Sequence, residues 1–333
     1  MLSEIDQNRK KLGIKKVTQT QPIYLYDAAL STMWGVNKGL PFTEILRLGL
    51  ELGFHRIELN HAVTPDMLAE IDLKYYKIGS IHDPCPAVIS KDELKAKDWV
   101  ISSLNEDCRH KGVDITLRTI DLAVKLDARS VIVHAGGITG DRSMELDLRA
   151  FYEQGLKDTS KYKALISKMR SDRTIRVKPH LMSVMRSLEE IVAYCRGSGI
   201  CVAIENRYHF YDIPTLDELG LLLSLTDNEW YGFQYDVGHA QALWQLDFFD
   251  HEDWLRRYSK RIIGVHLHDV RGIIDHLAPG TGDVDFEKIA TYLPVSAYRT
   301  LEVSSTLTIE DVRFGMETLV EKGCVRKYER DVF

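Results

Sequence analysis

The feature that most constrains this chain is a repeat of short apolar runs that each end in an acidic residue or a histidine. Six such runs of strand-forming residues end at His82, His134, Glu205, Asp236, His266 and Glu302. With 12 His and 49 Asp plus Glu in 333 residues, about one position in five carries such a residue, so a single case is an ordinary solvated strand end. Parallel strands, however, bring their carboxyl ends to one face, so six ends of this kind predict side chains that converge.

Eight candidate strands alternate with helical segments along the chain. The strands are predicted at residues 22–27, 56–59, 77–82, 130–134, 201–205, 231–236, 262–266 and 298–302. Apolar spacings of three and four residues predict the main helices over about 42–52, 98–126, 216–225, 253–261 and 310–322. This alternation predicts an α/β protein, a (β/α)8 TIM barrel that residues 22–333 form as one domain. Residues 1–21, which are polar and contain lysines, are predicted to be an N-terminal extension.

The regular alternation is interrupted after the fourth strand by about sixty residues, too many for one simple helical return. We predict a basic insertion over about residues 140–178, followed by a helix from Pro179 to Arg196. Between residues 157 and 178, eight lysines and arginines stand against Asp158 and Asp172. Such a segment is either a solvated helical insertion or a lid or anion-binding wall beside the site.

Composition limits the classes of partner. A net charge of −6 argues against a surface built for nucleic acid, so duplex DNA is a less favoured partner than a small molecule. No apolar run approaches the roughly 20 residues that span a bilayer, so no membrane partner is expected. The five cysteines lack a Cys-x-x-Cys spacing and are predicted to be reduced, which places the protein in the cytoplasm. The sequence leaves a homo-oligomer possible.

The four strand ends in the second half of the chain predict a metal site. Glu205, Asp236, His266 and Glu302 lie about one strand–helix unit apart, so they would meet at the rim of the barrel. Three carboxylates and one imidazole suit a divalent ion such as Zn or Mn, with Mg or Co as options. The alternative is a set of unrelated salt bridges, but converging acids need a cation to stay ionised.

Four further histidines form an outer group. Each is individually more typical of a hydrogen-bonded core or loop residue, but together with the first set they could complete a second metal site or a cluster of two or three ions. They are His82, His134, His239 and His276.

These segments together resemble the xylose-isomerase-like TIM barrel superfamily, which contains sugar phosphate isomerases and epimerases and the endonuclease IV type of AP endonucleases (family 2). The resemblance runs from about residue 22 to 323 and fails in the basic insertion. It rests on the runs Val133-His-Ala-Gly-Gly, Ala203-Ile-Glu-Asn, Tyr235-Asp-Val-Gly-His, Val265-His-Leu-His-Asp, Pro279-Gly-Thr-Gly-Asp-Val-Asp-Phe and Leu301-Glu-Val.

The resemblance implies roles for the candidate residues. In the isomerase and epimerase branch, the residues that match the first four hold one divalent ion, and in the endonuclease branch the residues that match the outer histidines join them to hold zinc. One departure is that the loop aspartate expected two residues before His276 falls at Ile274, with Asp275 beside it. His268 stands where the family often has lysine or asparagine and is either a substrate contact or a ligand in place of His266.

We therefore expect a divalent-metal-dependent isomerase or epimerase of a sugar or sugar phosphate. Glu205 and Glu302 would exchange a proton at the carbon next to the carbonyl, with His239 as a third candidate catalytic residue. The substrate's hydroxyls, or a phosphate, would be held by Asn206, Arg207, His239, His268 and Arg271. The alternative is a zinc-dependent phosphodiester hydrolase acting on abasic DNA or on a small nucleotide-like ester. A barrel that only binds a ligand is a third class, which the presence of both glutamates disfavours.

Overall fold

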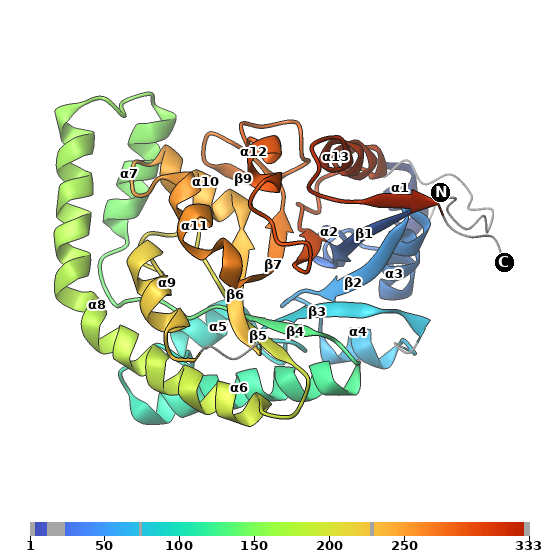
Figure 1. Ribbon diagram of the computed structural model, residues 1–333, viewed down its shortest axis with the longest axis horizontal. Coiled ribbons are helices and arrows are strands. Elements are labelled where there is room, and N and C mark those ends of the chain that lie inside the picture. The colour runs from blue at the N-terminus through green and yellow to red at the C-terminus, as the bar shows by residue number, and fades with distance from the viewer. Residues whose placement is uncertain (1–3, 12–23, 73–74, 227–229, 330–333) are drawn as a thin grey trace.

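In the computed structural model, which describes residues 4–11, 24–72, 75–226 and 230–329, eight parallel strands close into a barrel (Figure 1). Each strand pairs with the next, and the pairing of the last with the first, which sets Ala29 opposite Thr300, closes the ring. The predicted TIM barrel is therefore confirmed. The barrel strands are β1 (Tyr24–Ser31), β2 (Phe54–Leu59), β3 (Ile78–His82), β4 (Ser130–Val133), β5 (Cys201–Glu205), β6 (Tyr231–Asp236), β7 (Ile262–Leu267) and β10 (Tyr298–Leu301).

Burial explains why the strands are visible in the sequence. Every residue of β3, β4 and β6 is buried, because the strands have helices on one side and the packed barrel interior on the other. Strands covered on both faces read as nearly continuous apolar runs. Where a polar side chain does occur at such a strand's carboxyl end, it enters the mouth of the barrel.

Helices surround the barrel (Figure 1). They follow the strands in the order expected of repeated strand–helix units. The helices are α1 (Glu4–Lys11), α2 (Met33–Val36), α3 (Phe42–Glu51), α4 (Pro65–Ala69), α5 (Lys91–Ala96), α6 (Glu106–Lys125), α7 (Ser143–Glu153), α8 (Ser160–Cys195), α9 (Leu216–Leu223), α10 (Val237–Gln245), α11 (His251–Tyr258), α12 (Phe286–Ala290) and α13 (Ile309–Glu321).

A small hairpin follows β7. It consists of β8 (Asp269–Arg271) and β9 (Ile274–Leu277), which pair antiparallel. The Asp269 carboxylate accepts hydrogen bonds of 2.8–3.1 Å from four backbone N–H groups between Val270 and Val284. Asp269 therefore fixes the loop after the hairpin. A last strand, β11 (Lys327–Glu329), pairs antiparallel with the start of β1.

The long helix predicted from residue 98 is wrong in its first turns. Residues 97–105 form a connection between α5 and α6, with Asp98 in the left-handed region at a φ of 54°. α6 begins after Asn105, whose side chain accepts a hydrogen bond of 3.0 Å from the backbone N–H of Cys108. An asparagine in this position satisfies a backbone donor that the first turn leaves free, so it sets the start of the helix.

The predicted helix start at Pro179 is also wrong, because α8 runs without interruption from Ser160 to Cys195 with Pro179 inside it. Proline lacks the backbone N–H and commonly bends a helix, and Figure 1 shows α8 changing direction between α7 and α6. Contacts with α7 and with α6 support its two halves. The predicted end of the insertion, at residue 178, therefore lies inside α8 and not at a helix boundary.

Three of the eight basic residues of this segment bind loops and helix ends of the barrel. Buried Arg173 forms an ion pair of 2.7 Å with Glu218 and donates to the carbonyl of Phe210 at 2.6 Å. Arg170 donates to the Phe248 carbonyl at 2.6 Å, and Lys157 forms an ion pair of 2.9 Å with Asp247. Lys157, Arg170 and Arg173 thus attach this segment to the residues after β5 and to the connection after α10.

The predicted N-terminal extension is described only in part. Residues 4–11 form α1, and Arg9 binds the carboxylate of Glu44 on α3 at 2.8 and 2.7 Å. Residues 12–21 of the extension, and Pro22, where the first strand was predicted to begin, lie outside the described residues. Within the described ranges, no helix has the length and apolar character needed to cross a membrane.

Candidate metal centre

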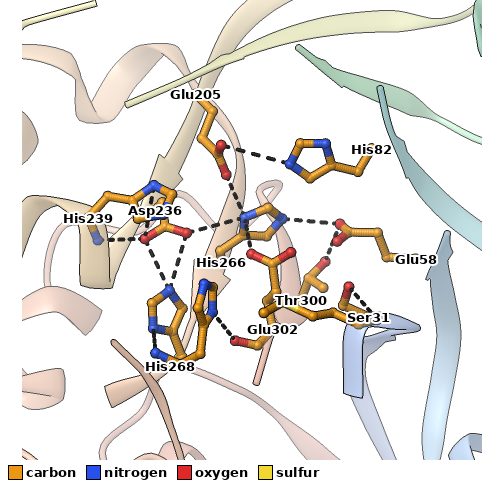
Figure 2. Close-up of polar contacts among 12 residues, drawn as sticks. Ser31, Glu58, His82, Glu205, Asp236, His239, His266, His268, Thr300 and Glu302 are labelled. Carbon is orange, nitrogen blue, oxygen red and sulfur yellow. Dashed lines mark hydrogen bonds and ion pairs between the residues drawn. The ribbon is translucent and has the colours of Figure 1, made fainter. Parts of the chain in front are cut away.

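Four strands bring the predicted metal ligands to one point at the mouth of the barrel. Glu205 ends β5, Asp236 ends β6, His266 lies near the end of β7, and Glu302 directly follows β10. The Nδ1 atom of His266 lies 2.8 Å from Glu205 Oε1, 3.0 Å from Glu302 Oε2 and 3.4 Å from Asp236 Oδ2. Figure 2 shows the three carboxylates directed at this one nitrogen. We call these four residues the central set.

Burial and charge oppose each other in the central set. Burial alone would lower the pKa of His266, but the carboxylates, Glu302 first among them, raise it well above its ordinary value. Burial would raise the pKa of Glu302, and the charge of His266 outweighs this effect and lowers that pKa. The pKa of Asp236 is lowered too, because His239 and His268 outweigh burial. One imidazolium thus balances several ionised carboxylates.

The central set fits a divalent cation. Its side chains offer three carboxylate oxygens and one imidazole nitrogen within 4.8 Å of one another, which is a donor set used for Mn, Mg, Co or Zn. The residues are 0–4% exposed, and ionised carboxylates at such burial need a positive partner. His266 would offer Nδ1, because its Nε2 atom faces away from the three carboxylates.

A fifth acid, Glu58, lies on that other side of His266. Glu58 Oε2 is 3.3 Å from His266 Nε2 and also accepts hydrogen bonds from Ser80 at 2.7 Å and Thr300 at 3.2 Å. Glu58 is fully buried inside the barrel, and its Oε1 atom has no hydrogen-bond partner among the described residues. We did not predict a role for Glu58. The available signal was an acid inside the apolar strand run Ile57-Glu58-Leu59.

Two of the outer histidines join the central set through Glu205. His134 Nε2 lies 2.7 Å and His82 Nε2 3.8 Å from Glu205 Oε2, and the two rings are 4.4 Å apart. Burial, and then the charge of Arg207, hold the pKa of His134 well below its ordinary value. His134 is therefore neutral, which is the form that binds a metal. His82, His134 and Glu205 form a second group of possible ligands.

The other two outer histidines lie on the opposite side, near Asp236. His239 Nδ1 is 2.9 Å from the Asn206 carbonyl, and His276 Nδ1 is 3.0 Å from the Glu302 carbonyl. His276 has a φ of 55°, a strained backbone conformation that is concentrated at functional sites. Asp275 comes close enough to form a third group with these two histidines. The one-residue departure from the family pattern therefore does not remove the aspartate from this side.

A sequence profile of one family covers most of the barrel: the xylose isomerase-like TIM barrel profile matches residues 50–313. The chain belongs to this xylose isomerase-like TIM barrel family. A curated relative, the uncharacterised protein y4fM of Sinorhizobium fredii, is 27% identical over 213 residues, which cover 63% of this chain and 55% of the relative. The chain thus spans little more than half the length of that relative.

Solved structures of other proteins share the fold. A D-tagatose 3-epimerase-like protein has a TM-score of 0.60 at 22% identity, over 88% of this chain and 96% of its own. The IolI protein with a bound zinc atom has a TM-score of 0.61 at 13% identity, over 89% of this chain and 97% of its own. The predicted family resemblance is therefore confirmed.

In this xylose isomerase-like barrel, the predicted substrate residues occupy different environments. Arg207 forms a short ion pair with Glu205 and lies 3.8 Å from Asp212, so its guanidinium borders the central set. Asn206 is fully buried, and its amide both donates to and accepts from the backbone of Asp236 at 2.8 Å. Asn206 thus holds the end of β6 in place, and its role as a substrate contact stays a prediction.

The remaining two candidate substrate residues, His268 and Arg271, lie at the hairpin of β8 and β9. His268 Nε2 is 3.1 Å from Asp236 Oδ1, and His268 Nδ1 accepts a hydrogen bond of 2.9 Å from the backbone N–H of His276. Burial lowers the pKa of His268, and Asp236 overcomes this and raises it to about 9. It is His266, and not His268, that meets all three carboxylates. Arg271 is exposed and donates to the Thr281 carbonyl.

A cavity of about 540 Å³ opens beside the central set. His134 and Arg207 line its inner end, and it extends between the α5–α6 connection, α6, α7 and α8. Its volume is in the range of small-molecule sites, roughly 300–1,000 Å³. We did not predict Lys91 or Trp99, which line it. Lys91 begins the short helix α5 and Trp99 lies in the connection after it, and neither position carries a distinguishing pattern in a single sequence.

Proposed function

We propose that this protein is a divalent-metal-dependent isomerase or epimerase of a sugar or sugar derivative. The observation that supports this most is the position of Glu205 and Glu302. They come from different strands and both contact the same nitrogen of His266. Two buried carboxylates beside one cation site are suited to moving a proton within a bound substrate.

Glu205, Asp236, Glu302 and the Nδ1 atom of His266 would hold the ion. When bound, a divalent ion would polarise the carbonyl and a neighbouring hydroxyl of the sugar, which makes the adjacent C–H more acidic. The pKa of Glu205 is lowered, because its contacts with His134 and His266 outweigh burial. Glu205 and Glu302 are therefore both ionised and able to accept a proton.

The proton transfer would run between the two glutamates. One carboxylate removes the proton from the carbon next to the carbonyl, the C–H electron pair forms a C=C bond, and the carbonyl π pair moves onto oxygen to give an enediolate. In an epimerase the other glutamate, in its protonated form, delivers a proton to the same carbon from the opposite face. In an isomerase the proton goes to the neighbouring carbon, and the hydroxyl proton moves to the former carbonyl oxygen. In Figure 2, Glu205 and Glu302 approach His266 from different directions, which supports this division of roles.

Other side chains would hold the substrate. Arg207 borders the central set and offers guanidinium N–H donors to hydroxyl oxygens. Both ring nitrogens of His268 have partners, Asp236 and the His276 N–H, so His268 would act on the substrate by orienting Asp236. His239 lies between Asn206 and Asp236, where it could orient a hydroxyl or shuttle a proton. Arg271, at the exposed hairpin, would bind a distal hydroxyl or phosphate.

The test is solvent exchange. Protein reconstituted with Mn, Co or Zn is incubated in D2O with a panel of ketoses and their phosphates, and deuterium is located by NMR. We expect deuterium only at carbons next to the carbonyl of an accepted substrate, and none with Glu302→Gln. Glu310→Gln, an exposed change on α13, is the matched control. Exchange by Glu302→Gln at the full rate would refute the proposal.

A second candidate function is zinc-dependent hydrolysis of a phosphodiester. It is favoured by the arrangement of four groups of possible ligands, of which the fourth is His268, His276 and Glu302. The group around His82 and the central set share Glu205, and the group around His276 lies beside Asp236. Two or three ions that act together are typical of phosphoester hydrolysis. Two or three zinc ions per chain, together with hydrolysis of bis-p-nitrophenyl phosphate, would support it, whereas one ion per chain and no hydrolysis would exclude it.

A further inference from the structure

The cavity beside the central set extends away from the residues of the proposed reaction. The reacting sugar must lie against Asp236, His266 and Glu302, yet none of these three lines the cavity. The cavity meets the central set only through His134 and Arg207. A sugar bound for reaction would therefore leave the cavity open for another part of the same molecule.

The outer wall of the cavity includes a tryptophan that is not part of the hydrophobic core. Trp99 is partly exposed and does not belong to the hydrophobic core formed by the described residues. Leu94, Ile101 and Ile115 line the same space. The Lys97 ammonium lies over the Trp99 ring, 5.1 Å from its centroid, so another ring would stack on the opposite face of the indole.

This wall is held rigidly. The backbone N–H of Trp99 donates to the Leu94 carbonyl at 3.0 Å, and the Ile101 carbonyl accepts from Ser187 on α8 at 3.0 Å. His180 on α8 binds the Ser102 carbonyl at 2.8 Å through Nδ1. The loop that carries Trp99 is thus attached to α8, and a site built on a fixed wall loses little entropy when it binds.

Cationic side chains lie at the junction between the cavity and the central set. Lys91 and Lys95 line the cavity with Arg207, and neither lysine has an ion-pair partner among the described residues. Burial, followed by the charges of Arg207 and Lys95, lowers the pKa of Lys91 to about 8. Lys91 lines the cavity together with His134 and Arg207, both of which contact Glu205. The N–H donors of these cationic side chains are placed to bind the oxygen atom that joins one ring of a substrate to the next.

We propose that the substrate is a sugar that carries the reacting carbonyl and is joined by a glycosidic bond to a second ring, and that this second ring stacks on Trp99 in the cavity. This inference rests on the proposed function for the reacting sugar. The second ring is either another sugar or an aromatic group, since both present an apolar face to Trp99.

The test measures binding to metal-loaded protein by titration calorimetry. The probes are methyl β-D-glucoside with one ring, and cellobiose and phenyl β-D-glucoside with two. We expect a two-ring probe to bind about tenfold more tightly than the one-ring probe. We expect Trp99→Ala to abolish this difference and Trp99→Phe to retain most of it. Trp244→Ala, which removes an exposed tryptophan on α10 outside the cavity, should leave it unchanged.

The outcomes distinguish a second sugar from an aromatic group, and they distinguish the glycoside inference from the proposed function. A gain with cellobiose alone identifies a second sugar, and a gain with phenyl glucoside alone identifies an aromatic group. Equal or absent binding of all three probes, or a gain that survives Trp99→Ala, overturns the inference. Solvent exchange with one-ring ketoses tests the proposed function separately, so its failure is distinguishable from failure of the glycoside inference.

A different observation concerns Glu58. It contacts the Nε2 atom of His266, on the side opposite the proposed ligand atom Nδ1, and Ser80 and Thr300 fix its carboxylate. Histidines that bind metals usually donate their second N–H to a carboxylate or carbonyl. We infer that Glu58 is a positioning residue that keeps the proton of neutral His266 on Nε2 and directs Nδ1 to the metal.

The test is metal affinity, measured by chelator competition with Zn and Co. Glu58→Gln should weaken binding about 10- to 100-fold and change the visible spectrum of the Co-loaded protein. Ser80→Ala, which removes a neighbouring contact but leaves Glu58 charged, should weaken it much less. Should Glu58→Gln fail to fold, Glu58→Asp, whose shorter side chain cannot reach His266 equally well, must show the loss. Unchanged affinity in the folded variant would overturn the inference.

Discussion

Two histidines of this barrel show opposite effects of their surroundings. His266 lies at the mouth among carboxylates, which overcome burial and raise its pKa well above the ordinary value. His251, at the start of α11, has neutral partners, the Tyr235 hydroxyl and the Gln241 amide, and burial lowers its pKa to about 4. Burial alone thus makes a histidine neutral. The charged His266 reports an excess of carboxylates at the mouth, and this excess is what a divalent cation would neutralise.

The largest expected effect is the loss of metal affinity when a residue of the central set is changed. Structural zinc sites gain about 10–16 kcal/mol from binding, so each of four ligands contributes roughly 2.5–4 kcal/mol, or on the order of a hundredfold to a thousandfold in affinity. Glu302→Gln should therefore weaken metal binding by about this factor and abolish turnover. Chelator competition measures the first and solvent exchange the second. An affinity within tenfold of the wild type would show that Glu302 is not a ligand.

The environment of His251, which lowers the pKa of this histidine, predicts an effect of pH on the free energy of unfolding. The unfolded chain protonates His251 below about pH 6.5, whereas the folded protein resists protonation until about pH 4. The stabilising contribution of neutral His251 is therefore present above pH 6.5 and is lost as the pH falls toward 4, by at most about 3 kcal/mol. We expect His251→Gln to flatten the dependence of the free energy of unfolding on pH over this interval, as measured by urea unfolding. An identical slope in the two proteins would contradict the assigned charge state.

A smaller effect is expected at the outer histidines. His134 contacts only Glu205 of the central set. His134→Ala should change the affinity of the first ion by only a few-fold, on the scale of a lost supporting contact. If the wild type binds a second ion, this variant should lose it, which metal analysis of dialysed protein would reveal. A loss of first-ion affinity as large as that of Glu302→Gln would place His134 in the primary site.

The sequence predicted which side chains converge at the strand ends better than it predicted where the helices between the strands begin and end. Glu205, Asp236, His266 and Glu302 could be found because each follows a buried apolar run, and the barrel topology alone brings such ends together. The start of α6 and the course of α8 could not be found, because Asn105 and Pro179 are local signals whose effect depends on tertiary packing.

Side-chain pairing was also beyond reach of the sequence. Glu58 is an acid inside a strand, and only the closed barrel shows that it faces His266 across the interior. The attachment of Trp99 to α8 depends in the same way on contacts between residues that are far apart in the chain. These contacts form only when the barrel closes, so no local pattern encodes them.

The central claim is that one divalent cation is bound by the central set. Anomalous diffraction from crystals grown with zinc and collected at its absorption edge tests it most directly. We predict a strong peak about 2.0–2.2 Å from His266 Nδ1 and from oxygens of Glu205, Asp236 and Glu302. A structure with zinc bound elsewhere, or with the carboxylates still hydrogen-bonded to His266 at saturating zinc, would contradict the claim.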